Sequence, residues 1–307
     1  MRRAAAVTLA TGVLLTVSPL AASSAQAATA PTVSAKGAYL MLGSNGAPVY
    51  TKGADTKRQM ASTTKVMTAA VVLSSPGLDL NRKVTVNKAY RDYVAAQGAS
   101  TADLRTGDKL TVRQLLYGLM LPSGCDAAFA LADTFGSGTT RTARAQNFIA
   151  KMNAKAVELG ARNTKFDSFD GISQTGNNVT TPRDLAKIAR YAMNNVNFRA
   201  VVKSTSYKST APTSTGGTRT YTWYNTNKLL GSYSGATGVK TGTGTAAGPC
   251  LVFAATRNGK TYIGVVLNSS SVNTRTTDAA KLLDYGFGSN TASTMKVRTL
   301  PPGAQRD

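Results

Sequence analysis

The chain has 307 residues and carries 36 Lys and Arg against 14 Asp and Glu, which gives a formal charge of +22 at pH 7. It contains no histidine, so a Ser-His-Asp catalytic triad is excluded. With two distant cysteines, Cys125 and Cys250, a metal site would need carboxylates alone, and we expect neither a metal nor another cofactor.

The first residues have the pattern of a secretory signal peptide. Arg2 and Arg3 form a short positive start, an apolar stretch runs from Ala4 to about Leu20, and Ala25-Gln26-Ala27 is an A-x-A cleavage site. The apolar stretch is short for a membrane span, and no other run of the needed length follows. We therefore expect a signal peptide over residues 1–27 and a secreted, extracellular protein, which argues against nucleic acid as the partner of its dispersed basic residues.

The first predicted element after this segment is a β-hairpin over residues 37–52, in which two apolar runs surround Ser44-Asn45-Gly46. Apolar residues then recur at three- and four-residue spacing, which predicts helices over 62–74, 111–120, 125–135, 140–159 and 181–194. The last of these begins at a clear signal, with Thr181 as the cap, Pro182 in the first turn and Asp184 three positions after the cap.

A second hairpin lies near the other end of the chain. Residues 250–256 and 261–268 flank Arg257-Asn258-Gly259-Lys260, whose Asn-Gly pair accepts the positive φ angles of a tight turn. A last helix is predicted over about 275–285. Strands at both ends with helices between them predict one α/β (α+β) unit in which the termini meet, with a helical lobe in the middle. A cleft between the two is the natural place for a site.

The first predicted helix carries a candidate nucleophile and base. Ser62 and Lys65 are three residues apart, so their side chains lie on one helix face and Lys65 Nζ can reach Ser62 Oγ. An uncharged lysine can replace histidine as the base that activates a serine. Taken alone, the pattern also fits an ordinary surface helix.

Two further motifs follow in order. In Leu121-Pro122-Ser123-Gly124-Cys125 the proline interrupts the helical run, which predicts that Ser123 lies on an exposed turn. Lys240-Thr241-Gly242 comes directly before the second hairpin. S-x-x-K, then a serine motif, then K-T-G is the motif order of the active-site serine penicillin-binding proteins.

The mature chain resembles, along nearly all of its length, the low-molecular-mass D-alanyl-D-alanine carboxypeptidases and transpeptidases of peptidase family S11. It is most similar to a secreted Gram-positive subgroup with cysteine in the second motif. The resemblance implies a serine DD-peptidase/β-lactamase-like fold, a mostly antiparallel sheet flanked by helices plus an all-helical lobe. The catalytic domain would span 28–287, followed by a tail over 288–307. The stretches that carry the resemblance are ASTTKVMTA, LRTGDKLTVRQLLYGLMLPSGCDAAFALA, NTKFDSFDG, TPRDLAKIA, TGVKTGTG and RTTDAAKLLDYGF.

The resemblance also implies roles for individual residues. Ser62 would attack a peptidoglycan stem peptide ending in D-Ala-D-Ala and form an acyl-enzyme, with Lys65 as base. Ser123 would relay a proton to the leaving amine, and Lys240 would favour the uncharged form of Lys65. β-Lactam antibiotics would acylate the same serine as inhibitors. The substrate-binding residues implied are Cys125, Lys240, Thr241, Gly242, Thr243 and Arg275, the last as the partner of the substrate carboxylate.

Cys125 departs from the family's usual asparagine in the second motif. A thiol is a weaker donor and acceptor than an amide, which affects β-lactam binding and hydrolysis of acyl intermediates. Near two lysines the thiol could be partly ionised and reactive. A disulfide from Cys125 to Cys250 would tie the cleft to the strand after the third motif, so we do not expect one.

Other functions are weighed against this interpretation. A class A β-lactamase uses a glutamate to activate water, but the single glutamate, Glu158, has no matching surroundings. The alternative of a different kind is a non-catalytic β-lactam-sensing or wall-binding protein, against which the intact motif residues argue. Asp167-Ser168-Phe169-Asp170-Gly171 is too sparse for a calcium loop and predicts a turn lining the helical lobe. The tail over 288–307 lacks apolar periodicity, so any envelope association would be by charge, and we expect a monomer.

Overall fold

The structure is a computed structural model that describes residues 1, 4–6 and 29–305. The predicted signal peptide therefore lies almost wholly outside the described residues. The centre of the fold is an antiparallel sheet of five strands in the order β2-β1-β11-β10-β9. Its strands are β1 (Gly37–Leu42), β2 (Pro48–Lys52), β9 (Ala236–Gly242), β10 (Cys250–Arg257) and β11 (Lys260–Leu267).

The two predicted hairpins meet in this sheet. β1 pairs with β11, with Gly37 opposite Leu267, so strands from the two ends of the chain lie side by side. Because successive strand residues face opposite sides, Leu40 packs with Leu282 of α8 (Val272–Phe287), whereas Met41 joins the core shared with the other helices. Both faces of the sheet are thus covered, and the prediction that the termini form one α/β unit is confirmed.

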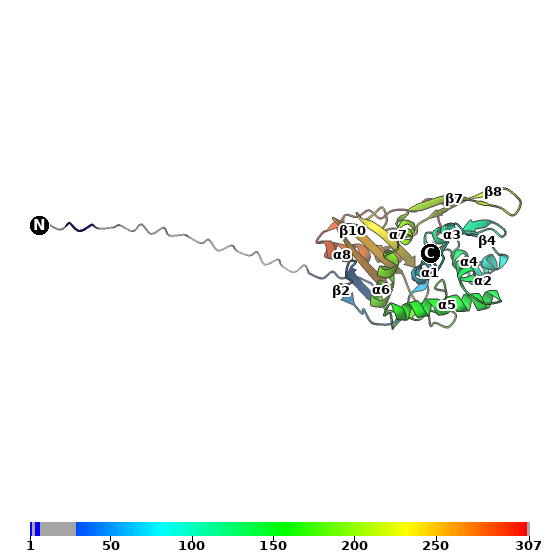
Figure 1. Cartoon of the computed structure of the whole chain (residues 1–307), viewed down its shortest axis with the longest axis horizontal. Helices are drawn as coiled ribbons and strands as arrows, with labels where there is room; N and C mark the ends of the chain where they lie inside the picture. Colours follow the sequence, from blue (N-terminus) through cyan, green and yellow to red (C-terminus); the bar gives the residue numbers. More distant parts are fainter. Residues whose placement is uncertain (2–3, 7–28, 306–307) are drawn as a thin grey trace.

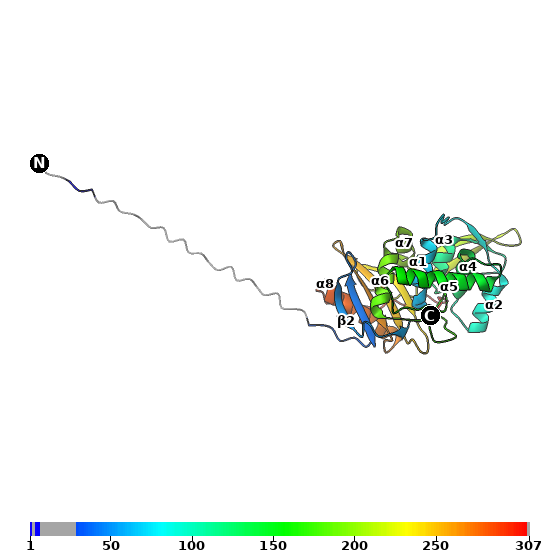
Figure 2. The same ribbon diagram turned by 60° about the horizontal axis from the view of Figure 1, so that its bottom comes forward.

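The middle of the chain forms the helical region. Figures 1 and 2 place α8 and β2 at one end of the molecule and α2 and α4 at the other. The predicted helices are present with shifts of a few residues at their ends, and α2 and α7 are additional. The helices are α1 (Lys65–Leu73), α2 (Lys88–Gln97), α3 (Val112–Met120), α4 (Cys125–Phe135), α5 (Arg141–Glu158), α6 (Pro182–Met193) and α7 (Val196–Lys203).

Local signals explain where several of these helices begin. The Thr181 hydroxyl accepts a hydrogen bond from Asp184 N at 3.1 Å and caps α6 as predicted. At α8 the cap is Ser271, which accepts from Thr274 N at 3.0 Å, so the helix begins before the predicted residue 275. The predicted helix over 62–74 begins instead as a 3₁₀ turn, η1 (Ala61–Thr64), that leads into α1.

A two-stranded ribbon of β7 (Ser206–Pro212) and β8 (Thr218–Tyr224) was not predicted. It is fastened to the helical region by Trp223, whose indole Nε1 donates to Ala102 O at 2.8 Å. The short pairs β3 (Arg58–Gln59) with β6 (Val179–Thr180), and β4 (Lys83–Thr85) with β5 (Lys109–Thr111), complete the strands among the described residues.

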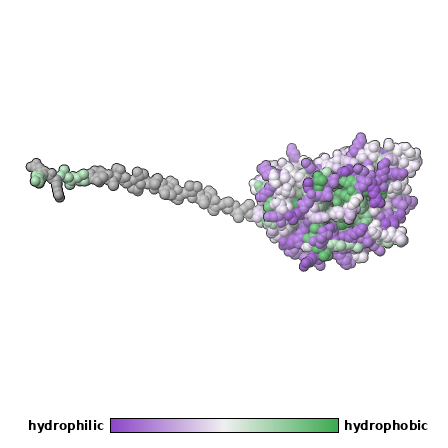
Figure 3. All heavy atoms as spheres, viewed as in Figure 1, coloured by the Kyte–Doolittle hydropathy of each residue, from purple (hydrophilic) through white to green (hydrophobic). Residues whose placement is uncertain are grey.

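The predicted tail after α8 packs against the body at least as far as Arg298. The Arg298 guanidinium donates to the carbonyls of Asn225 at 2.6 Å and Asn227 at 3.2 Å. On the face seen in Figure 3, hydrophilic residues prevail and apolar residues form small separate areas. Among residues 29–305, no helix has the length and apolarity that a membrane span requires.

Candidate active site

Ser62 and Lys65 lie where the 3₁₀ turn η1 passes into α1. Lys65 Nζ donates to Ser62 Oγ at 2.9 Å, so the contact predicted from their spacing is present. Every residue of α1 is buried, including Lys65, whereas Ser62 remains partly exposed. The pair is therefore held by a packed helix with the hydroxyl open to a substrate.

The Lys65 amine has two further neighbours. Its Nζ donates to Asp170 O at 2.9 Å and lies 3.3 Å from Cys125 Sγ. A lysine amine offers three donors when charged and one lone pair when neutral, so these contacts fix its direction in either state. The Cys125 and Asp170 contacts come from separate segments, which makes Lys65 the meeting point of α1, α4 and the loop before β6.

The segment 167–171 has a larger part in the site than its sequence indicated. Gly171 has φ +101°, and a Cβ there would lie 2.1 Å from Ala61 O and 2.8 Å from Ser62 N. The loop backbone thus lies directly against the backbone of Ala61 and Ser62. The only signal in the sequence was the glycine at position 171, a residue type that readily adopts a positive φ. Its place in the site became clear only from the fold.

The second motif is buried, which corrects the expectation that Ser123 lies on an exposed turn. Ser123 has φ +66° and no exposed surface, and its carbonyl accepts from Ser100 Oγ at 2.7 Å. Its own Oγ is buried without a hydrogen-bond partner among the residues that the structure describes. Buried polar atoms are nearly always satisfied, so an orphan hydroxyl here points to a group that bonds to a ligand.

Cys125 begins α4 beside this serine. Burial raises the pKa of its thiol to about 11, against the opposing effect of the Lys65 charge, so the group is a neutral thiol near pH 7. The expectation of a partly ionised thiol is therefore wrong. The two cysteines are not joined in this structure, and Cys250 Sγ contacts Ala247 O at 3.5 Å.

Asp126 fixes the position of the second motif, and nothing in the sequence pattern singled it out. Its buried carboxylate accepts from Ala102 N at 2.8 Å, Leu104 N at 3.0 Å and Thr101 Oγ1 at 2.8 Å. These bonds tie the loop before β5 to the first turn of α4. A carboxylate is also favourable at this end of a helix because it faces the positive end of the helix dipole.

The third motif lies against the first. Gly242 ends β9, and a Cβ there would lie 3.0 Å from Ser62 N and 2.9 Å from Thr63 N. Lys240 is fully buried, and its Nζ donates to Thr241 O at 2.9 Å. Strand β9 therefore forms one wall of the candidate site, with the backbone of Gly242 beside that of Ser62.

Arg275 reaches the same wall from the first turn of α8. Its Nη1 donates to Gly242 O at 3.1 Å and to Thr243 Oγ1 at 2.9 Å, and the side chain is 3% exposed. It is thus a buried residue of the site and not a solvated arginine at a helix start. Among residues 29–305, no three His, Cys, Asp or Glu side chains converge as a metal ion would need.

Comparison with known proteins identifies relatives across nearly the whole chain. Residues 24–271 match the model of the family Peptidase_S11, D-alanyl-D-alanine carboxypeptidase. The D-alanyl-D-alanine carboxypeptidase of Streptomyces sp. strain K15 is 58% identical over 288 residues, which cover 94% of this chain and 99% of the relative. DacB2 of Mycobacterium tuberculosis, also a D-alanyl-D-alanine carboxypeptidase, is 36% identical over 75% of this chain and 74% of its own length.

Solved structures of the same family have the same fold as this chain. The crystal structure of the Streptomyces K15 DD-transpeptidase matches with a TM-score of 0.83 and 60% identity, over 85% of this chain and 99% of that one. The D-alanyl-D-alanine carboxypeptidase DacD of Francisella tularensis matches with a TM-score of 0.73 and 27% identity, over 84% of this chain and 71% of that one. The serine DD-peptidase fold that the resemblance implied is therefore confirmed.

Proposed function

This chain belongs to the peptidase S11 family of D-alanyl-D-alanine carboxypeptidases, and from that premise we propose how its own residues carry out the reaction. It is a serine-type DD-peptidase that binds penicillin and acts on peptidoglycan peptides ending in D-Ala-D-Ala. The observation that carries the residue assignment is the 2.9 Å contact between Ser62 Oγ and Nζ of the fully buried Lys65.

In the acylation step, Ser62 Oγ attacks the carbonyl carbon of the penultimate D-Ala while Lys65 Nζ accepts the hydroxyl proton. Burial disfavours a charged amine in general, which is the physical reason that a lysine can act as a base. The backbone N–H groups of Ser62 and Thr243 are the proposed donors to the oxyanion.

Collapse of this intermediate breaks the C–N bond, and the departing amine of the terminal D-Ala takes a proton. The buried, unsatisfied Oγ of Ser123 supports a role for this hydroxyl in passing that proton from Lys65. An acyl-enzyme remains on Ser62. Attack by water completes hydrolysis, and attack by an amine of a neighbouring stem completes transpeptidation; each releases Ser62 and returns its proton.

The substrate's terminal carboxylate is proposed to bind at the end of the site formed by β9 and α8. Arg275 lies there, buried and bonded to Thr243 Oγ1, so its positive charge is directed at the third motif. Thr241, whose hydroxyl pairs with that of Thr226 at 2.6 Å, adds a polar group on the same strand. A fixed arginine is the usual partner for a carboxylate.

The glutamate that a class A β-lactamase would need is absent from the site. Glu158 ends α5, its side chain is 60% exposed, and it pairs with Lys155 at 2.6 Å. It therefore has no part in activating a water beside Ser62. A non-catalytic sensing role is disfavoured by the intact contact between base and nucleophile.

The direct test is intact-protein mass spectrometry after incubation with benzylpenicillin, followed by D-Ala release from a tripeptide ending in D-Ala-D-Ala, with and without glycine as acceptor. We expect one penicilloyl adduct on Ser62 and release of D-Ala. No adduct and no release would contradict the assignment. The ratio of hydrolysed to aminated product assigns the preferred acceptor.

Gly171→Ala is expected to destabilise the fold by at least about 2 kcal/mol and to slow acylation. The added Cβ would meet Ala61 O at 2.1 Å, so the backbone of Ser62 must shift. Thermal unfolding and the penicillin acylation rate measure the two effects. Gly176→Ala is the matched control, because it also has a positive φ, +74°, but its Cβ would meet only Gln59 Nε2 at 3.5 Å. Equal acylation rates in the two variants would contradict the inferred contact.

Cys125→Asn is expected to change deacylation or β-lactam reactivity more than folding. The new amide carries both a donor and an acceptor beside Lys65, which lies 3.3 Å from the present sulfur. The measurements are the acylation and deacylation rate constants for benzylpenicillin, with the unfolding midpoint as control. Unchanged rate constants would remove Cys125 from the list of residues that tune the reaction.

The cellular setting follows from the sequence. We propose that residues 1–27 direct export and that the mature protein acts outside the cell as a monomer. The formal charge is +22 for the whole chain and +20 once Arg2 and Arg3 are removed with the signal peptide, and this positive charge favours association with an anionic envelope.

A further inference from the structure

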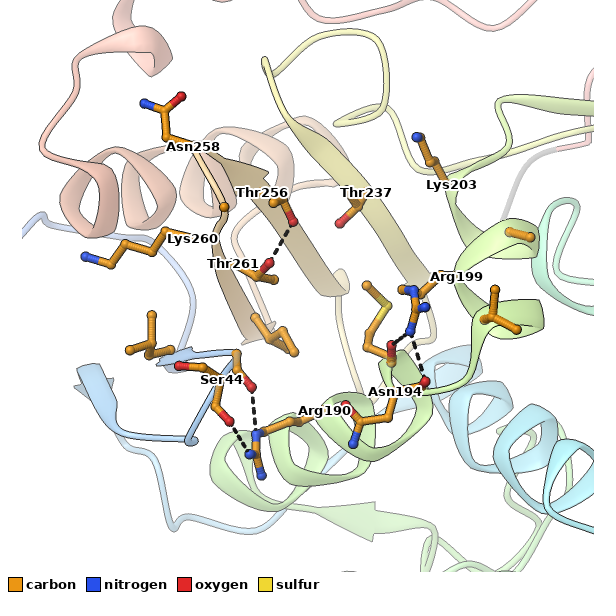
Figure 4. Close-up of a pocket in the computed structure, with 17 residues that line it drawn as sticks. Ser44, Arg190, Asn194, Arg199, Lys203, Thr237, Thr256, Asn258, Lys260 and Thr261 are labelled. Atoms are coloured by element: carbon orange, nitrogen blue, oxygen red, sulfur yellow. Dashed lines mark hydrogen bonds between the residues drawn. The ribbon is translucent and has the colours of Figure 1, made fainter.

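A cavity of about 960 Å³ opens at the other end of β9 from the catalytic residues (Figure 4). Its walls are the end of α6, helix α7, and the turns of the two hairpins. Thr237 lies on the β9 side of the cavity. It precedes Lys240 by three residues, which corresponds to about 10 Å along a strand. No proposed catalytic residue lines this cavity, so it is a separate site on the same strand.

The charged side chains that line the cavity are all positive. Arg190, Arg199, Lys203 and Lys260 line it, and no acidic residue does. Figure 4 shows Lys260 and Lys203 on opposite sides of the opening, with the two arginines below them. Within the described part of the chain, none of the four forms an ion pair. A hollow lined by one charge concentrates the field and attracts anions.

The two arginines are held in place by neutral partners. Arg190 donates to the carbonyls of Gly43 at 2.8 Å and Ser44 at 2.7 Å. Arg199 donates through Nη1 to two carbonyls at the end of α6, at 2.7 and 2.9 Å. Because carbonyls do not neutralise a guanidinium, the positive charge remains available while the side chains are ordered. Such preorganisation reduces the entropy lost on binding.

The rest of the lining suits a ligand with hydroxyl and C–H groups. Thr237 Oγ1 is buried without a hydrogen-bond partner among the described residues, and Figure 4 shows this side chain at the cavity. Leu42 and Val196 supply apolar surface, and Val196 is 66% exposed. A purely ionic ligand would leave the hydroxyl and this apolar surface unused.

We propose that this cavity, the basic pocket lined by Arg190, Arg199, Lys203, Lys260 and Thr237, binds a phosphodiester-linked polyol polymer. Its phosphates would face the four cations, a polyol hydroxyl would bond to Thr237 Oγ1, and the carbon chain would lie on Leu42 and Val196. Repeated phosphates suit cations that stand on opposite sides of the opening. Binding needs no acylation, so the inference does not rest on the proposed function.

The test is a titration of the full-length mature protein against a fluorescent glycerol-phosphate oligomer, followed by anisotropy at an ionic strength of about 0.15 M. Lys203→Gln with Lys260→Gln is expected to weaken binding about tenfold or more. Lys57→Gln with Lys208→Gln is the matched control, since it removes the same charge from exposed lysines outside the pocket, and should weaken binding less than about threefold. Thr237→Val leaves the charge unchanged and should still weaken binding.

Three results would overturn the proposal. Equal losses in the two lysine pairs would show binding by diffuse charge. Inorganic phosphate that displaces the oligomer at equal phosphate concentration would show a site for a single anion. Binding to phosphatidylglycerol vesicles that is tighter than binding to the oligomer, and that is lost in the Lys203→Gln, Lys260→Gln variant, would show a lipid surface as the ligand. As the folding control, the Lys203→Gln, Lys260→Gln variant should be acylated by penicillin at the wild-type rate.

Discussion

Ser62→Ala is expected to abolish the penicilloyl adduct and to lower D-Ala release by about 10⁴-fold or more. The reason is that no other hydroxyl can take its place: Lys65 Nζ is directed at Ser62 Oγ at 2.9 Å, and the Ser123 hydroxyl is buried. Folding should be affected little, because the lost group is a partly exposed hydroxyl with one hydrogen bond, worth about 1 kcal/mol. Intact mass, D-Ala release and thermal unfolding are the three measurements.

Ser123→Ala is the control for this prediction. It removes the other motif hydroxyl, and it should slow the reaction while the adduct still forms on Ser62. A penicilloyl adduct of normal yield on the Ser62→Ala protein would refute the assignment, whatever the effect on D-Ala release. Retained adduct formation in Ser123→Ala together with its loss in Ser62→Ala separates the nucleophile from the proton relay.

The features that could be predicted from the sequence depend only on residues close together in the chain. Asn258-Gly259 gives a tight turn wherever the surrounding residues alternate as strands, so the second hairpin was predictable. Thr181 and Asp184 define a helix start within four residues. The spacing of Ser62 and Lys65 places both on one face of a helical turn, and the 3₁₀ geometry of η1 did not prevent their contact.

The parts that were missed depend on contacts between distant segments. The carbonyl of Asp170 approaches Lys65 across 105 positions, and any residue could have supplied that carbonyl. Ser123 was expected on an exposed turn because proline breaks helices, but the loop before β5 covers it, held by Asp126. The β7–β8 ribbon is mostly polar and exposed, and in β8 only Tyr221 and Trp223, which alternate with exposed threonines, mark its buried face.

These missed contacts explain why the motif residues lie close together. Lys65 is reached by the backbone at Asp170, by Cys125 at the start of α4 and by Ser62, so three segments determine one amine position. A site held this way loses little entropy when the reaction begins. A change in any of the three segments is then felt at Lys65, even where the changed residue touches no substrate.

Lys65→Ala is expected to slow acylation of Ser62 by at least about a hundredfold near neutral pH, since a well-placed base contributes about 10² to 10⁴ in rate. The structural reason is the direct contact between Nζ and Ser62 Oγ, with no other basic side chain bonded to that hydroxyl among the described residues. The measurement is the second-order acylation rate with benzylpenicillin, with far-UV circular dichroism to show that the fold is retained.

Two further measurements on Lys65 separate a base from a side chain that only fills space. Lys65→Met keeps the length of the buried chain but removes the nitrogen, so it should be as slow as Lys65→Ala if proton transfer is what is lost. Small primary amines added to Lys65→Ala should restore part of the rate, more strongly the more basic the free amine, because general-base catalysis follows basicity. A Lys65→Met protein that acylates near the wild-type rate would show that packing is the role of this residue, and another group would then have to take the Ser62 proton.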